Sequence, residues 1–308
     1  MSRVLKPIVM DVDTGTDDAL AIIYAIGHPD VELRGISCVA GNVPLDQVVI
    51  NTCKVLDAIG AGDIPVAAGA AEPLSESLRR KSSSHGLDGL AGIQLPDTPR
   101  RPSPLTAVDL LHQLIMDSAQ PVTLVTLAPK TNLALLLKEH PDIAAQIEMI
   151  IFMGGAVNGR TAEFNVWQDP EAAAYLIESA IPTAMYGLDM FERLIIERHY
   201  IDRFRAHDHP AIRLAGELLQ RRSGHNGPNQ RRVGLLGDAG ALVLMTNTEL
   251  FGTEELPVRI ELTGAKRGHS ILGREAAANA WPRIRVAVDL DVAKAAAAFV
   301  DTINAYAA

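Results

Sequence analysis

The sequence predicts an α/β fold in which a single domain over residues 1–308 holds a mostly parallel, open sheet with helices on both faces. Three observations predict it. Short apolar runs alternate with longer helical segments along almost the whole chain, the order found in parallel sheets. Hydrophobic residues make up 48% of the chain, which is enough for a large core. The sequence also contains no internal repeat, low-complexity tail or clear linker that would divide it.

The first part of the chain begins with a buried strand and an amphipathic helix. The apolar run at residues 4–10 predicts the strand, and the helix that follows has an acidic first turn, which its dipole favours. Glycine closes the next helix at residue 60. The expected elements, in order, are strand 4–10, helix 16–26, strand 31–42, helix 45–60, strand 64–69, a loop over 72–104 rich in Pro, Ser and Gly, and helix 105–119.

The second part of the chain continues the same alternation. A polar stretch, "RRSGHNGPNQRR", interrupts an otherwise helical region before the last elements. The expected elements, in order, are strand 121–129, helix 131–141, strand 147–155, helix 169–180, strand 181–189, a mostly helical stretch over 192–236, helix 237–247, strands at 258–262 and 283–291, and helix 292–307.

Composition excludes several classes of protein. The net charge of −9 argues against a nucleic-acid binder, and no uncharged apolar span is long enough for a membrane helix. The spacing of Cys38 and Cys53 fits neither a zinc site nor a disulfide framework, so both are expected as core thiols. The N-terminus lacks the pattern of a signal peptide. We therefore expect a cytoplasmic protein with neither a nucleic-acid nor a membrane partner.

The segment "IVMDVDTGTDDALAI" at residues 8–22 carries four aspartates: Asp11, Asp13, Asp17 and Asp18. Carboxylates this close raise one another's pKa and destabilise the fold unless something neutralises them. A divalent cation is the expected partner. If the strand alternates, Asp11 points away from Asp13 and orients the turn.

Other interpretations of this segment explain less of it. An EF-hand loop requires a glutamate at its twelfth position, where this chain has Ile22. A Mg²⁺-dependent phosphatase motif, Asp-x-Asp-x-Thr, would place threonine where Gly15 stands, and leaves Asp17 and Asp18 unexplained. Helix capping accounts for one or two of the acids. A metal site explains all of them together.

Oxygen-bearing side chains recur where the expected strands end. Asn42 ends the second strand, Thr126 and Met153 stand near the ends of later ones, Asp189 ends another, and Asp238 opens a helix. Ligands of open α/β sheets bind beyond the carboxyl ends of the strands. Each residue alone has a plainer explanation, such as a turn residue at Asn42 or a helix N-cap at Asp238. Their convergence predicts one binding site.

The aspartate segment resembles the signature of the inosine–uridine-type nucleoside hydrolases, Asp-x-Asp-Pro-Gly-x-Asp-Asp-Ala, with Thr14 in place of the proline. The resemblance covers most of the chain and implies a Rossmann-like nucleoside hydrolase fold. Further blocks that match are "VAGN" at 39–42, "HGLDGL" at 85–90, "LVTLAPKTNLA" at 124–134, "MGGAVNGRTAEFNVWQDPEAA" at 153–173 and "GDAGALV" at 237–243.

The resemblance implies an enzyme that hydrolyses the N-glycosidic bond of a ribonucleoside to a free base and ribose. It implies Ca²⁺ as cofactor, a hard cation that takes six to eight oxygen ligands. Its ligands would be Asp13, Asp18, the carbonyl of Thr126 and Asp238. The metal would lower the pKa of a bound water, and Asp13 would accept the proton as general base. The carboxylates would stabilise an oxocarbenium-like transition state.

The resemblance also implies how the substrate is held. The 2′ and 3′ hydroxyls of ribose would contact Asp17, Asn42 and Asn165. The 5′ hydroxyl would contact Glu163 and Asn158. Met153 would lie near the face of the sugar. The implied partner is a small-molecule ribonucleoside, in purine or pyrimidine salvage, and the chain is expected to form a homodimer or homotetramer.

Two residues depart from the family pattern on the side of the base. Many members have histidine before the last metal-binding aspartate, and a purine-preferring branch has tryptophan, whereas this chain has Gly237. Phe191 also stands where a polar residue, often threonine, is usual. Three other residues are candidates for contacting the base: His85, His225 and Trp167. Gly237 would leave room for a larger base or simply an open pocket.

Two alternatives to the hydrolase remain open. One is a non-catalytic binder of nucleosides or ribose, which the presence of Asp13 argues against because a binder needs no general base. The other is the Mg²⁺-dependent phosphatase. The preferred base remains open between purine, pyrimidine and modified forms.

Overall fold

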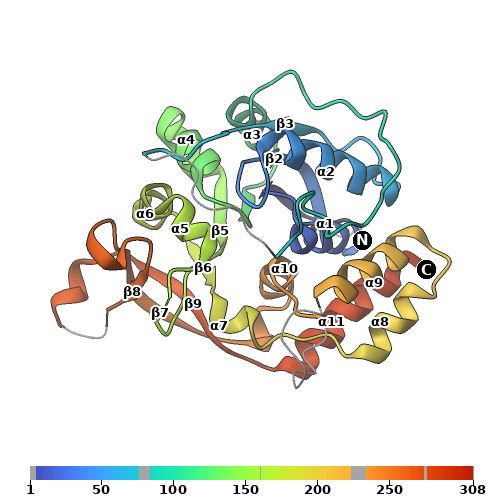
Figure 1. The fold of residues 1–308 in the computed structure, drawn as a ribbon. Helices are drawn as coiled ribbons and strands as arrows, with labels where there is room; N and C mark the ends of the chain where they lie inside the picture. The colour runs from blue at the N-terminus through green and yellow to red at the C-terminus, as the bar shows by residue number, and fades with distance from the viewer. Residues whose placement is uncertain (1–4, 76–83, 160, 223–233, 274–275, 308) are drawn as a thin grey trace.

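The structure is a computed structural model that describes residues 5–75, 84–159, 161–222, 234–273 and 276–307. In that part of the chain, nine strands form a sheet of order β3-β2-β1-β4-β5-β6-β9-β7-β8, with helices on both sides (Figure 1). The first seven strands of this order pair in parallel, whereas β7 pairs antiparallel with both β9 and β8. The prediction of a mostly parallel α/β sheet is confirmed.

The strands follow the apolar runs of the sequence. Parallel strands buried on both faces need nearly continuous apolar runs, and β4 and β5 have them. The strands are β1 (Lys6–Val12), β2 (Val31–Cys38), β3 (Val66–Ala68), β4 (Val122–Thr126), β5 (Ile147–Met153), β6 (Thr183–Tyr186), β7 (Phe251–Ile260), β8 (Ser270–Leu272) and β9 (Arg283–Leu290).

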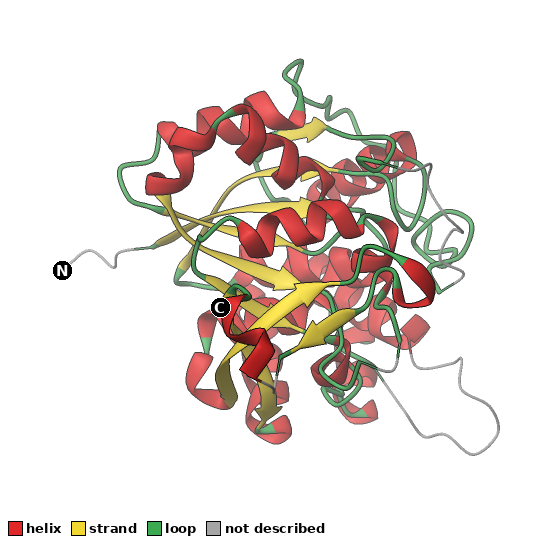
Figure 2. Cartoon of the chain, turned by 90° about the vertical axis from the view of Figure 1, so that its left-hand side faces the viewer, coloured by secondary structure: helices red, strands yellow, loops and turns green. Residues whose placement is uncertain are grey.

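The helices cover the sheet as connections between strands, and Figure 2 shows the twisted strands between them. Several begin at capping residues: Thr106 accepts a hydrogen bond from the backbone of Asp109 at α3, and Asp291 does so from Lys294 at α11. The helices are α1 (Thr16–Gly27), α2 (Leu45–Ala58), α3 (Ala107–Met116), α4 (Thr131–Glu139), α5 (Phe164–Gln168), α6 (Pro170–Glu178), α7 (Leu188–Phe191), α8 (Arg198–Arg205), α9 (Pro210–Arg222), α10 (Asp238–Thr246) and α11 (Val292–Asn304).

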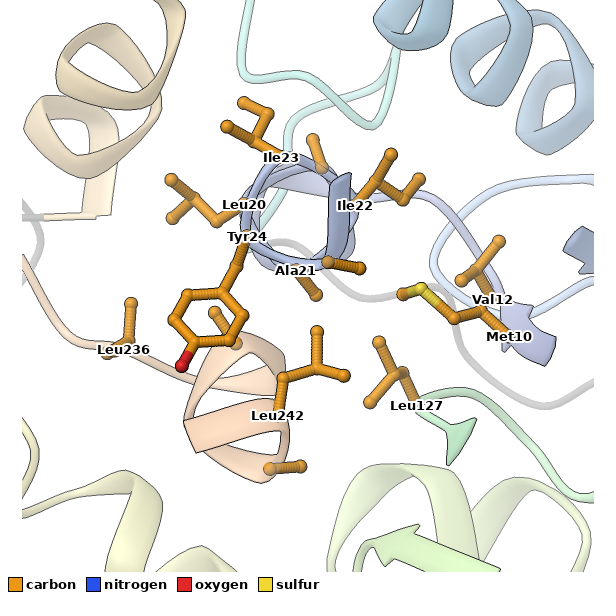
Figure 3. Packing of buried hydrophobic residues seen from close by; sticks show 14 of the residues in the cluster. Met10, Val12, Leu20, Ala21, Ile22, Ile23, Tyr24, Leu127, Leu236 and Leu242 are labelled. Atoms are coloured by element: carbon orange, nitrogen blue, oxygen red, sulfur yellow. The ribbon is translucent and has the colours of Figure 1, made fainter. Parts of the chain in front are cut away.

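Strand β1 contributes side chains to two apolar cores, one on each face of the sheet. Met10 and Val12 pack with α1 and α10 in the larger core, whereas Val9 points to the other face. Figure 3 shows Leu20 and Tyr24 of α1 packed near Leu242 of α10. These side chains are fully buried, so truncating one to alanine would cost about 2–5 kcal/mol of stability. The packing fixes the end of β1 against the start of α10.

The structure differs from the expected elements mainly near the C-terminus. Strand β7 begins at Phe251, earlier than expected. The sequence analysis missed its first part because that part contains exposed acids, such as Glu254 and Glu255, and lacks an apolar run. Strand β8 was not expected, since three residues are too short to show a period. Asp189 does not end a strand; it lies in α7, where its side chain accepts a hydrogen bond from the backbone of Val157.

Strand β2 ends at Cys38, short of the expected Asn42. The following residues leave the ladder and turn across the sheet edge, which places Asn42 beside the end of β1. No helix in the described part of the chain has the length and apolar character needed to cross a membrane.

Candidate active site

A cavity of about 310 Å³ opens at the edge of the sheet where the parallel strands end, a size at the lower limit of small-molecule sites. Its lining comes from residues that follow β1, β2 and β5 and from the starts of α5, α7 and α10. The lining residues are Asp13, Asp17, Asn42, Ser84, His85, Leu127, Met153, Ala162, Glu163, Phe164, Asn165, Leu188, Phe191 and Asp238.

Asp18 holds the turn between β1 and α1 in place. One of its carboxylate oxygens accepts from the backbone N–H of Gly15 at 2.9 Å, and the other accepts from that of Asp13 at 3.2 Å. Both donors lack partners within the helix because they precede its first turn. The sequence therefore fixes this carboxylate locally, and the fold then buries it completely.

Asp13 is held by the segment that follows β2. Its two oxygens accept from the backbone N–H of Asn42 at 2.7 Å and from the side-chain amide of Asn42 at 3.1 Å. A side chain at Gly41 would overlap this carboxylate, so glycine is required for the close approach. Asp13 is thus fixed in one orientation at the cavity wall.

The buried carboxylates repel one another. Burial, and then the charges of Asp18 and Asp17, raise the pKa of Asp13 well above its ordinary value. Burial and the charge of Asp17 likewise raise the pKa of Asp18 to about 7. Anionic groups held this close in a dry site are stable only with a neutralising partner.

Carboxylate oxygens of Asp17, Asp18 and Asp238 lie within 4.8 Å of one another, which fits a hard divalent cation. This group shares Asp18 and Asp238 with the set Asp13, Asp18, Thr126 and Asp238 that the sequence suggested, and it contains Asp17 in place of Asp13. Asp13 still lines the same cavity.

Thr126 ends β4 directly beside β1, where it pairs with Asp11. Its hydroxyl is buried and has no hydrogen-bond partner among the described residues. Asp11 does not line the cavity; it accepts from the hydroxyl of Ser37 at 2.6 Å and from the amide of Asn132 at 2.8 Å. Asp11 therefore links β1 to β2 and α4 behind the cavity, and burial raises its pKa to about 6.

Lys130 is a site residue that the sequence analysis did not identify. It is fully buried, and its ammonium donates to the carbonyls of Ala128 at 2.5 Å and Met153 at 2.6 Å. The ammonium also lies 4.6 Å from the ring centre of Phe152. Burial lowers its pKa to about 8 although nearby acids, first Glu163, oppose that shift. The only signal was a lysine within the otherwise apolar turn "LAPKTNL".

Another wall of the cavity is formed by the segment between β5 and α5. Glu163 caps α5 by accepting from the backbones of Asn165 at 3.0 Å and Val166 at 3.1 Å. The amide of Asn165 donates to the carbonyl of Leu127 at 2.7 Å. Burial raises the pKa of Glu163. Helix α5 therefore presents a fixed carboxylate and a fixed amide to the cavity.

His85 approaches from the loop before α3. Its Nδ1 lies 3.2 Å from the backbone nitrogen of Thr16 and 3.4 Å from a carboxylate oxygen of Asp17. A backbone N–H can only donate, so Nδ1 accepts and the neutral ring carries its proton on Nε2. Protonation of the ring would exchange that contact for an ion pair with Asp17.

Two described residues that the sequence suggested as substrate contacts, Asn158 and Trp167, are not part of the cavity lining. Asn158 is exposed in the turn after β5. Trp167, in α5, packs against the backbone of Gly268 at the β7–β8 turn. His225 lies outside the described residues.

Comparison with known proteins identifies the relatives of this chain. Residues 8–297 match the family profile described as inosine-uridine preferring nucleoside hydrolase. The chain is 36% identical to a pyrimidine-specific ribonucleoside hydrolase, RihA, of Salmonella arizonae, over 92% of this chain and 94% of the relative. It is 35% identical to the Escherichia coli protein of the same name, with the same coverage.

Solved structures agree with the sequence matches. A purine-preferring ribonucleoside hydrolase from Gardnerella vaginalis superposes with a TM-score of 0.90 at 28% identity, over 98% of this chain and 99% of the other. An inosine-guanosine nucleoside hydrolase superposes with a TM-score of 0.88 at 25% identity, over 97% and 99%. The relatives therefore share a fold and a reaction but differ in the base that their names specify.

Proposed function

The chain belongs to the inosine–uridine preferring nucleoside hydrolase family, and from this premise we propose that it hydrolyses the N-glycosidic bond of a ribonucleoside with Ca²⁺ as cofactor and Asp13 as general base. The observation that carries the proposal is the position of Asp13. It lines the cavity next to the group formed by Asp17, Asp18 and Asp238, and two hydrogen bonds from Asn42 fix its orientation.

The residues at the end of β1 suit calcium. Carboxylates and a main-chain carbonyl are the hard oxygen ligands that Ca²⁺ prefers. We assign the ion to Asp13, Asp18, Asp238 and the carbonyl of Thr126, with Asp17 close enough to share it. When bound, the ion neutralises these acids and makes a neighbouring water more acidic.

Asp13 acts on the water that attacks the sugar. The two hydrogen bonds from Asn42 keep its carboxylate pointed in one direction, as a general base requires. Positive charge develops on the ribose ring as the bond to the base breaks, and the surrounding carboxylates stabilise that charge. The base departs with the electron pair of the broken bond, the water oxygen bonds to the anomeric carbon, and Asp13 takes a proton from that water.

The ribose is held by the fixed polar groups of the cavity. We assign its 2′ and 3′ hydroxyls to Asp17, Asn42 and Asn165, and its 5′ hydroxyl to Glu163, with Asn158 in the turn nearby. Met153 lies against the sugar face. These groups are already immobilised by hydrogen bonds within the protein, so little ordering is needed when the sugar binds.

His85 is the residue that we assign to the base. Among the described lining residues it is the one imidazole, and its Nε2 carries the proton in the neutral ring. The names of the relatives specify different bases, so they do not decide between purine and pyrimidine. The sequence hypotheses for His225 and Trp167 lack structural support, because one is outside the described residues and the other faces away from the lining.

The remaining parts of the proposal concern the setting. We propose a cytoplasmic enzyme of nucleoside salvage that works as a homodimer or homotetramer. The non-catalytic binder is disfavoured because it would need no general base, which is the role that we assign to Asp13. The phosphatase is disfavoured because Asp11, the first aspartate of that motif, does not line the cavity and instead accepts hydrogen bonds from Ser37 and Asn132.

The test is a screen of the purified protein with added Ca²⁺ against purine, pyrimidine and modified ribonucleosides, followed by chromatography, with p-nitrophenyl riboside alongside. We expect release of free base from at least one nucleoside and its loss in an Asp13→Asn variant. Binding of ribose without any cleavage would instead establish a binder. Hydrolysis of p-nitrophenyl phosphate would establish the phosphatase.

A further inference from the structure

Gly237, which immediately precedes α10, lies between two residues of the cavity lining, Phe191 and Asp17. A Cβ atom at this position would overlap Cε2 of Phe191, and would lie 2.8 Å from Cδ2 of the same ring and from Oδ2 of Asp17. The backbone at Gly237 has φ −74° and ψ −103°, which is neither helical nor extended. A Cβ here would therefore meet close contacts in addition to a backbone conformation outside the main regions of other residues. The room expected at Gly237 is filled by the ring of Phe191.

The backbone holds Phe191 and Gly237 in this register. Residues 194–196 pair with residues 234–236: the N–H of Leu236 donates to Leu194 at 3.0 Å, and that of Ile196 donates to Gly234 at 3.0 Å. At the other end of α7, the N–H of Leu188 donates to the carbonyl of Gly155 at 2.8 Å. Backbone hydrogen bonds on both sides of Phe191 in the chain therefore fix the position from which its ring enters the cavity.

The two side chains that a Cβ at Gly237 would meet belong to different halves of the cavity: a sugar half, to which we assign the ribose, and a base half, to which we assign the base. Asp17 belongs to the acidic group at the end of β1, whereas Phe191 and Leu188 form an apolar wall from α7. Because both Asp17 and Phe191 lie within 2.8 Å of a single point, the change from sugar half to base half occurs at this glycine. A planar base leaving a ribose held at Asp17 meets the ring next.

We propose that Phe191 and Gly237 form one unit that determines base selectivity, in which the Phe191 ring contacts the planar face of the base and supplies no proton to it. This inference rests on the proposed ribonucleoside hydrolysis. The ligand class is a ribonucleoside whose heterocycle presents an apolar face to the ring. The small residue at 237 is needed so that the ring and Asp17 keep their positions.

The test is a double-mutant cycle with Phe191→Ala, Gly237→Ala and the double variant, measured with inosine and uridine as substrates and with free ribose as a competitive inhibitor. Stacking of a base on an aromatic ring contributes about 1–3 kcal/mol, or roughly five- to 150-fold. We expect Phe191→Ala to lower kcat/KM for the preferred nucleoside within that range, to change the inosine to uridine ratio, and to leave the inhibition constant of ribose within about twofold.

Gly237→Ala should weaken the binding of both ribose and the nucleoside, because the new Cβ would displace both Asp17 and the Phe191 ring. In the double variant the space left by Phe191 accepts the new methyl group, so ribose inhibition should return to within about threefold of the wild type. Gly35→Ala is the matched control: its Cβ would overlap one leucine, Leu114, in a core region that contributes no residue to the cavity lining. It should lower the melting temperature and leave the inosine to uridine ratio unchanged.

Additive effects in the cycle, or an unchanged substrate ratio in Phe191→Ala with a wild-type melting temperature, would overturn the inference. Its failure is distinguishable from that of the proposed function. If the wild type cleaves neither a nucleoside nor p-nitrophenyl riboside, the hydrolase proposal fails. If the wild type is active but indifferent to these substitutions, only the role of Phe191 and Gly237 fails.

Discussion

The two halves of the cavity are built in opposite ways. The sugar half, the part to which we assign the ribose, consists of buried acids and amides that follow strands or begin helices. Hydrogen bonds to backbone groups fix these side chains, as for Asp13, Asp18 and Glu163. The base half consists of side chains from a loop and from a helix of four residues, α7, and its wall is apolar at Leu188 and Phe191.

This difference affects how readily the residues of each half can be substituted. Strand ends are placed by the core on both faces of the sheet, so a change in the sugar half disturbs groups that depend on one another. Loops and short helices tolerate substitution more readily because fewer buried contacts fix them. The contrast accounts for relatives whose names share ribonucleoside hydrolysis but differ in the base.

The most severe way to break the sugar half is Asp13→Asn. Asparagine keeps the shape of the side chain but is a far weaker proton acceptor, so kcat should fall by about 10²–10⁴-fold. Single-turnover measurements with the preferred nucleoside would separate this loss from product release. Asp189→Asn, in α7 but outside the cavity lining, is the control and should retain activity within a few fold. Equal losses in both variants would contradict the role of Asp13.

Removing divalent metal should reveal the repulsion within the sugar half. The pKa of Asp18 rises from 3.8 to about 7 on folding, so its unfavourable contribution is absent below pH 4 and complete above pH 7. At 1.36 kcal/mol per unit, protonation of Asp18 should add about 2–3 kcal/mol to the stability of the metal-free protein as the pH falls from 8 to 5.

Thermal unfolding in chelator, at several pH values, measures this gain. Added Ca²⁺ should raise the melting temperature most at pH 8, where the acids are charged, and least at pH 5. A melting temperature that falls on acidification over this range, in chelator, would show that the acids are not held as the structure indicates. Asp18→Asn should flatten the pH dependence.

Glu163→Gln tests the far end of the sugar half. The substitution removes a charge from the residue that we assign to the 5′ hydroxyl, and a hydrogen bond to a charged group contributes about 1.5–3 kcal/mol, or roughly 10- to 150-fold in kcat/KM. The matched control is Glu171→Gln, in α6, which loses the ion pair of Glu171 with Arg267. The wild type should strongly prefer a ribonucleoside to its 5′-deoxy analogue. Glu163→Gln should lose that preference, and Glu171→Gln should keep it.

His85→Gln should have a smaller effect, because it belongs to the base half. Glutamine can still accept from the backbone of Thr16 but cannot act as an acid, so kcat/KM for a nucleoside should fall by up to about 10²-fold, the lower end of what general acid catalysis contributes. Hydrolysis of p-nitrophenyl riboside, whose leaving group needs no proton, should change by less than threefold. A similar loss on both substrates would assign His85 to the sugar instead.

Trp167→Phe should have the smallest effect. The side chain packs against Gly268 and does not line the cavity, so steady-state rates with every nucleoside should stay within about twofold of the wild type. A shift in base preference larger than Phe191→Ala produces would mean that the tryptophan reaches the substrate after all.

Much of the fold and of the sugar half could be read from the sequence because the signals are local. Apolar runs and helical periodicity placed most strands and helices, and the acids of the β1–α1 turn lie within eight residues. Strand β8 and the first part of β7 were not predicted, because these segments show no clear hydrophobic period.

The sequence by itself determined that four aspartates gather after β1 and that polar residues end several strands, because spacing and strand direction place them there. Only the tertiary structure decided that Asn42 binds Asp13, that Lys130 is buried behind the cavity, and that the ring of Phe191 fills the space beside Gly237. Each of these depends on contacts between segments distant in the chain. Whether two such side chains share a volume is set by packing, for which no local pattern exists.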